Sequence, residues 1–149
     1  MPNKRMANKK GNNTNDETYY VWVGGSCDYG RKERAGGGAY IVEQNGKETG
    51  RYVTSGLGTT EFRMMLTVMI HAMETLDANS TIVFMTNVSY LQNFDKTPNE
   101  KTANADLIAQ CIATKERHLS VSLKIVSYHK YAQLPETHEM AHKAMLGRR

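Results

Sequence analysis

The sequence predicts an α/β domain with five strands, because strand-like and helix-like hydrophobic patterns follow one another along the chain. Three strand-like segments come first, at 19–27, 39–44 and 48–55, and an Asn-Gly hairpin signal at 45–46 joins the last two. From Phe62 to Leu76 the apolar residues then follow the spacing of a helix. Of the 149 residues, 40% are hydrophobic and 23% are charged, which is ordinary for one globular domain with its own core.

The three opening strands are expected to form an antiparallel unit. The first segment, YYVWVGGSC, is aromatic and β-branched, as strands commonly are. The loop predicted at 28–38 carries the basic run RKER at 31–34 and three glycines at 36–38. Short turns between strands favour antiparallel neighbours.

Helices and single strands alternate along the rest of the chain. Thr59 or Thr60 is suited to cap the long helix, and Pro135 is suited to the first position of the final one. The predicted segments after the third strand are a helix at 62–76, a strand at 80–87, a short helix at 88–94, a loop at 95–104, a helix at 105–117, a strand at 120–128 and a helix at 135–145.

Charge and cysteine content indicate a basic protein of a reducing compartment. The net charge is +4 and the pI is about 9.1, which favours a polyanionic partner. No apolar stretch approaches the roughly 18 residues of a membrane helix, and the N-terminus does not resemble a secretory signal. Cys27 and Cys111 are expected to be two structural thiols. We therefore expect an intracellular protein, cytoplasmic or nucleoid-associated, with no membrane partner.

The two ends of the chain are polar and basic. Residues 1–18 place Lys and Arg among Asn, Gly and Thr, which predicts a disordered basic tail. Such a tail would either contact phosphates or only keep the protein in solution. Residues 147–149 form a basic C-terminal tail, which leaves 19–146 for the folded domain.

Several short motifs resemble the type 1 ribonuclease H family, and they occur in the family's order. The motifs are Gly25-Ser26-Cys27 at the end of the first strand, the glycines at 36–38, TTEFR at 59–63, IVFMTNVSYL at 82–91, NADL at 104–107 and LPETHEMAHKAM at 134–145. The resemblance covers most of the chain. It implies a ribonuclease H-like fold, in which a five-stranded mixed sheet of three antiparallel and then parallel strands is flanked by helices.

The same resemblance indicates a lost metal centre. Enzymes of this family cut the RNA strand of an RNA–DNA hybrid with two magnesium ions that four carboxylates hold. The matching positions in this chain are Gly24, Met65, Asn87 and His138. Without carboxylates these positions offer nothing anionic to two neighbouring divalent cations. We therefore predict a catalytically inactive pseudo-nuclease without metal or other cofactor.

Loss of four acids also removes the repulsion between the site and a phosphate backbone. Lys and Arg side chains can then supply affinity by releasing counterions. We predict binding of RNA–DNA hybrid or double-stranded RNA without cleavage. The predicted nucleic-acid-binding residues are Arg31, Lys32, Arg34, Thr60, Lys96, Lys101, His129, Lys130 and Tyr131, with Tyr29 and Phe62 as further aromatic contacts.

Two other functions stay open on the sequence alone. The first is a protein-interaction scaffold within a larger nucleoprotein assembly, which Glu61 and Phe62 favour because they replace asparagines that read the groove in the family. The second is an active ribonuclease H whose metal site has moved to other acids. Those acids would be Asp28, Glu61, Asp106 and Glu139. A continuous basic stripe would favour nucleic acid as the partner, and an apolar patch would favour protein.

Overall fold

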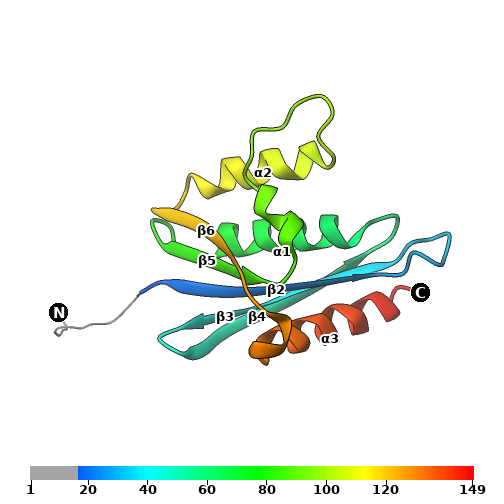
Figure 1. The fold of residues 1–149 in the computed structure, drawn as a ribbon, viewed down its shortest axis with the longest axis horizontal. Helices are drawn as coiled ribbons and strands as arrows, with labels where there is room; N and C mark the ends of the chain where they lie inside the picture. Colours follow the sequence, from blue (N-terminus) through cyan, green and yellow to red (C-terminus); the bar gives the residue numbers. More distant parts are fainter. Residues whose placement is uncertain (1–16) are drawn as a thin grey trace.

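A five-stranded mixed sheet forms the middle layer of the computed structural model, which describes residues 17–149 (Figure 1). The strands are β2 (Tyr19–Cys27), β3 (Gly36–Gln44), β4 (Lys47–Gly56), β5 (Thr81–Thr86) and β6 (Ser120–Ile125). They lie side by side in the order β4-β3-β2-β5-β6. β3 runs antiparallel to β2 and β4, whereas β5 runs parallel to β2 and β6. The predicted α/β class and mixed sheet are confirmed.

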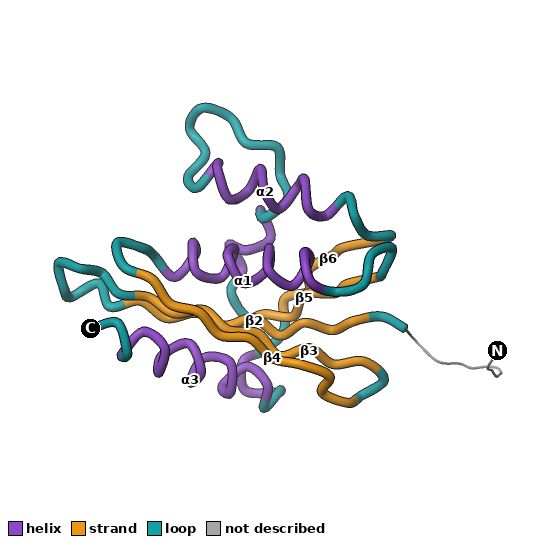
Figure 2. The backbone as a smooth tube through the Cα atoms, turned by 180° about the vertical axis from the view of Figure 1, so that it is seen from behind, coloured by secondary structure: helices purple, strands orange, loops and turns teal. Residues whose placement is uncertain are grey.

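Helices cover both faces of this sheet (Figure 2). On one face, α1 (Glu61–Thr75) packs against β2, β3 and β4, and α2 (Ala105–Lys115) packs against α1. On the other face, α3 (Gln133–Leu146) packs against the same three strands. Two short 3₁₀ helices, η1 (Ser89–Asn93) and η2 (Tyr128–Lys130), follow β5 and β6. Among residues 17–149, no helix has the length and apolar character needed to cross a membrane.

The larger hydrophobic core lies between α1 and the sheet. Met65, Met69 and Met73 of α1 are almost completely buried there, together with Phe84 of β5. Unbranched methionine side chains adapt to irregular spaces between other groups. The methionines of this helix therefore fill the core.

Glycines bring α3 unusually close to the opposite face. A β-carbon at Gly37 would lie 2.0 Å from the carbonyl oxygen of Ala141, and a β-carbon at Gly24 would lie 2.7 Å from Thr137 Oγ1. Neither strand position can carry a side chain while the helix stays in place. A smaller apolar cluster completes this side of the molecule and consists of Trp22, Ile41, Met85 and Leu134.

The strand boundaries differ from the prediction at two places. Residues 36–38 belong to β3 and not to the preceding loop, because they pair with both β2 and β4 where the helices leave no room for larger residues. β6 ends at Ile125, and the predicted extension to Tyr128 is wrong because Tyr128 begins η2.

The helix prediction needs two corrections as well. Pro135 is the third residue of α3 and not the first, because the helix begins at Gln133. The N–H groups of a first helical turn have no partner within the helix, so proline is tolerated there. The segment at 88–94 forms the 3₁₀ helix η1 and not an α-helix.

The chain ends and the cysteines can be compared with prediction only in part. Apart from its last two residues, the predicted tail at 1–18 lies outside the described residues. At the other end, Arg149 Nε lies 3.1 Å from Asp28 Oδ2, so the last residue of the chain contacts the loop between β2 and β3. Cys27 and Cys111 are free thiols, as expected.

Candidate nucleic-acid interface

A pocket of about 260 Å³ opens where β2 and the end of β5 meet the first turns of α1 and α3. The four positions predicted to have lost carboxylates all line it, although they come from four separate segments. The complete lining is Val23, Gly24, Gly25, Glu61, Met65, Asn87, Val88, Tyr128, Leu134 and His138. The sequence motifs therefore identified residues that do share one place in the structure.

Two of these four positions are closed to polar chemistry. A β-carbon at Gly24 would lie 2.9 Å from the backbone nitrogen of His138, so α3 occupies the space that a side chain would need. Met65 is 1% exposed and belongs to the larger core. Both positions serve packing, and a carboxylate at either one would disturb the contact between a helix and the sheet.

The other two positions are exposed and polar. Asn87 follows the last residue of β5, and His138 lies in the second turn of α3. The ring of His138 meets the ring of Tyr128 edge-on, with centroids 6.4 Å apart. An amide and an imidazole can exchange hydrogen bonds with a ligand but carry no fixed negative charge.

Glu61 is the one carboxylate of the pocket, and two tyrosines position it. Tyr90 donates a hydrogen bond from its hydroxyl to Glu61 Oε1 at 2.7 Å, and the backbone N–H of Glu61 donates to the Tyr29 hydroxyl at 3.1 Å. Phe62 packs edge-on against Tyr90, with ring centroids 4.9 Å apart. Burial and the neighbouring Glu61 carboxylate both raise the pKa of Tyr90.

The sequence prediction missed Tyr128 as a pocket residue and Tyr90 as the partner of the pocket residue Glu61. Both come shortly after a parallel strand, Tyr90 after β5 and Tyr128 after β6. Residues at the carboxyl ends of parallel strands commonly surround a ligand site. Their position just after a parallel strand was the sequence signal from which both residues could have been predicted.

The four acids of the relocated metal site do not come together. Each has a partner of its own: Asp28 with Arg31 and Arg149, Glu61 with Tyr90, Asp106 with Arg63, and Glu139 with Lys143. Within the described part of the chain, no three His, Cys, Asp or Glu side chains gather closely enough to hold a metal ion. The geometry therefore gives no support to the moved site.

Solved structures share this arrangement of strands and helices. Comparisons of the sequence with protein-family models and with curated proteins find no match. The crystal structure of LC9-RNase H1, a type 1 RNase H with the type 2 active-site motif, superposes with a TM-score of 0.72 at 20% identity, over 93% of this chain and 76% of that one. The chain has a ribonuclease H-like fold.

A second structure agrees with this assignment. The N-terminal RNase H domain of rv2228c from Mycobacterium tuberculosis, solved as a fusion with maltose binding protein, gives a TM-score of 0.68 at 12% identity, over 89% of this chain and 96% of that one. The ribonuclease H-like fold predicted from the motifs is confirmed. The loss of catalytic carboxylates stays a prediction, because a likeness at this identity concerns the fold alone.

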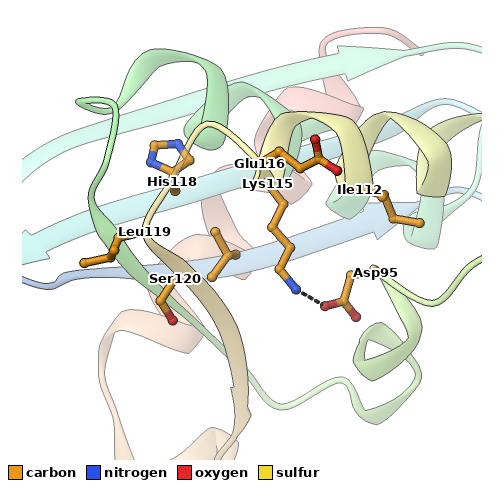
Figure 3. Close-up of a pocket in the computed structure, with 8 residues that line it drawn as sticks. Asp95, Ile112, Lys115, Glu116, His118, Leu119 and Ser120 are labelled. Carbon is orange, nitrogen blue, oxygen red and sulfur yellow. Dashed lines mark hydrogen bonds and ion pairs between the residues drawn. The ribbon is translucent and has the colours of Figure 1, made fainter.

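A second pocket of this ribonuclease H-like fold, about 290 Å³, lies at the carboxyl end of α2 (Figure 3). Lys115 and Asp95 form an ion pair of 2.7 Å in its wall. His118 donates from Nε2 to the carbonyl oxygen of Met73 at 2.6 Å, because a carbonyl can only accept. Leu119 beside it is 77% exposed. None of the predicted nucleic-acid-binding residues lines this pocket.

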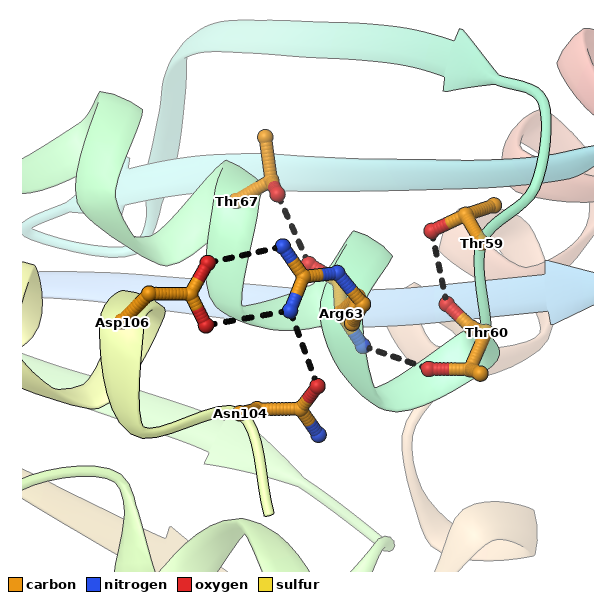
Figure 4. A network of polar contacts seen from close by, with 6 residues as sticks. All are labelled: Thr59, Thr60, Arg63, Thr67, Asn104 and Asp106. Atoms are coloured by element: carbon orange, nitrogen blue, oxygen red, sulfur yellow. Dashed lines mark hydrogen bonds and ion pairs between the residues drawn. The ribbon is translucent and has the colours of Figure 1, made fainter. Parts of the chain in front are cut away.

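Motif residues near the start of α1 have structural partners (Figure 4). Arg63 donates to both carboxylate oxygens of Asp106, at 3.1 and 2.9 Å, and to Asn104 Oδ1 at 3.0 Å. Thr60 caps α1 by accepting from the Arg63 backbone N–H at 3.1 Å. The motifs TTEFR and NADL therefore join α1 to α2, and Arg63 lowers the pKa of Asp106.

Apart from Thr60, which caps α1, the predicted binding residues fall into three places on the ribonuclease H-like fold. Those nearest the pocket, at 129–131, adjoin Tyr128; the ring of Tyr131 also packs on Trp22 at 5.1 Å. Arg31, Lys32 and Arg34 are exposed in the loop between β2 and β3, which Tyr29 links to Glu61. Lys96 and Lys101 lie in the loop before α2 and do not line the pocket.

Proposed function

We propose that this chain binds nucleic acid, either RNA–DNA hybrid or double-stranded RNA, and does not cleave it by a metal-dependent reaction. The observation that carries the proposal is the pocket between β2, β5, α1 and α3. The four positions that match the family's carboxylates line it as glycine, methionine, asparagine and histidine. Glu61 is the only acid in that lining, and one carboxylate does not suffice for two magnesium ions.

Exposed cations in two segments that adjoin pocket residues support the binding half of the proposal. Lys130 follows Tyr128 in η2, and Lys32 lies in the loop that Tyr29 joins to α1. Such side chains gain affinity for a phosphate backbone by releasing condensed counterions, with no need for metal. The double helix is then recognised by its shape and charge more than by its sequence.

The test compares binding and cleavage on the same substrates. Gel shifts with RNA–DNA hybrid, duplex RNA and duplex DNA are run in magnesium, in manganese and in chelator. We expect the same affinity for hybrid or duplex RNA in all three conditions and no product of hydrolysis. Hydrolysis in either metal, or binding that disappears in chelator, would contradict the proposal.

Two single variants locate the contact surface. Lys32→Ala and Lys130→Ala should each reduce the slope of log affinity against log salt by about 1, because each removes one phosphate contact. Lys47→Ala is the matched control, since Lys47 is exposed in the hairpin at the other end of β3. Equal slopes for all three variants would place the nucleic acid elsewhere.

A protein-interaction scaffold is the second candidate, and the exposed apolar residues favour it. Leu119 is 77% exposed just before β6, and Val53 is 45% exposed on β4. These two strands are the outer edges of the sheet, where another chain can add a strand. If the gel shifts find no nucleic acid bound under any condition, the protein-interaction scaffold becomes the better supported of the two functions.

A further inference from the structure

The chemistry of the pocket suits a flat, hydrogen-bonding ring better than a backbone phosphate. Its floor is apolar, with Val23, Met65 and Leu134 each about 1% exposed. Its rim carries polar groups of different kinds: a carboxylate, an amide, an imidazole and a phenol, from Glu61, Asn87, His138 and Tyr128. An apolar slot with a few convergent polar groups is the usual form of a small-ligand site.

The volume and charge restrict what can enter. Pockets for drug-sized ligands measure roughly 300–1,000 Å³, so 260 Å³ suits a single ring system and excludes a double helix. The negative charge of Glu61 repels a phosphate group. A nucleobase is flat and uncharged, and it can stack on an aromatic ring such as that of Tyr128.

The position of Glu61 selects among the bases. Tyr90 holds Oε1 at 2.7 Å, and this hydrogen bond fixes the direction of the carboxylate. A carboxylate accepts hydrogen bonds at both oxygens and donates none, and its capacity exceeds the one bond that Tyr90 supplies. Its best partner therefore presents two neighbouring N–H donors.

Guanine is the base with that pattern. Its N1–H and N2–H₂ groups are adjacent donors on one edge, and its O6 is an acceptor that the Asn87 amide can meet. Uracil places carbonyl oxygens on both sides of its single N–H, and these would face the carboxylate. Adenine and cytosine each present one amino group beside an acceptor nitrogen. We propose that the Glu61–Asn87 pocket binds an unpaired guanine base of the bound nucleic acid, an inference that rests on the proposed function.

The test uses hybrids that differ by one unpaired nucleotide. Fluorescence anisotropy measures the affinity for a fully paired RNA–DNA hybrid and for hybrids with a single bulged G, A, C or U in the RNA strand. We expect bulged G to bind about tenfold more tightly than the other three, because a bidentate contact to a base discriminates by at least about that factor. Equal affinity for all four bulges would overturn the inference.

Substitution of the carboxylate checks the assignment to Glu61. Glu61→Gln replaces an acceptor by a donor where guanine also donates, so the preference for bulged G should fall to within about twofold of the other bases. Affinity for the fully paired hybrid should not decrease, because the substitution removes a negative charge that repels phosphate. Glu74→Gln is the matched control: it removes the same charge from an exposed position on the same helix, outside the pocket. A preference that survives Glu61→Gln would contradict the role of this side chain.

Free mononucleotides separate the pocket from the surrounding surface. Titration with GMP and AMP, followed by amide chemical shifts, should show GMP shifting residues of the pocket lining and AMP leaving them in place. If the paired hybrid binds but neither the G bulge nor GMP is preferred, this inference fails and the proposed function stands. If neither the paired hybrid nor duplex RNA binds, the proposed function fails, and GMP shifts at the pocket would show a site for a free guanine nucleotide instead.

Discussion

The two faces of the sheet are packed in different ways. At Gly25, on the α1 face, flexible side chains meet the strand, because a β-carbon there would contact the side chains of Met65 and Glu61 first. On the α3 face, the helix backbone itself meets the strands, at Gly24 and Gly37. At Gly25 the nearest groups are side chains that can move aside, whereas at Gly37 they are peptide atoms that cannot. Backbone contact also occurs on the α1 face, where a β-carbon at Gly38 would lie 2.7 Å from the carbonyl oxygen of Met64.

This difference explains why the pocket has its present chemistry. Its α3 wall is fixed by contacts between backbones, so the strand can present only glycine at position 24. Its α1 wall is made by side chains, and there a carboxylate, Glu61, reaches the rim. The polar groups of the rim come from both helices, Glu61 from α1 and His138 from α3, whereas the strand between them presents only glycine at position 24.

The largest expected effect is that of Gly37→Ala. The added methyl group would lie 2.0 Å from the carbonyl oxygen of Ala141, so α3 must move away from the sheet. We expect the free energy of unfolding, measured in urea, to fall by about 3 kcal/mol or more. Gly50→Ala on β4 is the control, because a β-carbon there meets no atom within 4 Å. Similar losses for both variants would refute the close approach of α3.

A neighbouring pair of glycines compares the two faces directly. Gly24→Ala pushes against the backbone of Thr137 and His138, whereas Gly25→Ala pushes against the side chains of Met65 and Glu61. We expect Gly24→Ala to reduce the free energy of unfolding by about 2 kcal/mol and Gly25→Ala by clearly less. Urea denaturation of the two variants under the same conditions measures both losses of unfolding free energy and shows which is larger. The reverse order would mean that the α1 face is the more rigid one.

The smallest expected effect is that of Asp106→Asn, which removes the ion pair with Arg63 between α1 and α2. Both side chains are substantially exposed, so the pair stabilises the fold only slightly and less at high salt. Arg63 lowers the pKa of Asp106 below its ordinary value of 3.8. The stabilisation is therefore present above pH 3.8 and is lost as the pH falls through the lower pKa of the folded state.

Melting temperatures at two pH values measure this effect. The wild type should melt slightly above Asp106→Asn at pH 7, and the difference should disappear at a pH well below 3.8. A difference that persists in strong acid would show that the substitution acts through packing and not through charge.

Hydrophobic spacing was sufficient to predict the elements of the fold, but not the role of the glycines. The run from Phe62 to Leu76 identified α1 because its buried methionines recur at helical intervals. The glycines at 36–38 were assigned to a loop, since glycine is common in loops. Their place in β3 depends on two helices that pack against the strand from later in the chain, and no local pattern contains that information.

The positions of the candidate site were predictable from the sequence, but the contacts of its side chains were not. The motif order located Gly24, Met65, Asn87 and His138, which all line one pocket. The motifs did not reveal that Tyr90 holds Glu61 or that Arg63 holds Asp106. Such pairs join segments that are distant in sequence, and a one-residue difference in a loop would change them. The distribution of the basic residues over three places could not be predicted either, because it also depends on how distant segments pack.

The contact between α3 and the first two strands has a consequence for the nascent chain. β2 and β3 leave the ribosome early, but their glycine-rich surface has no cover until α3 has been made. Long-range contacts of this kind form late in folding. A protein shortened before Gln133 would expose strand backbone to other protein molecules and should precipitate. It also could not form the pocket, because Leu134 and His138 of α3 make up one of its walls.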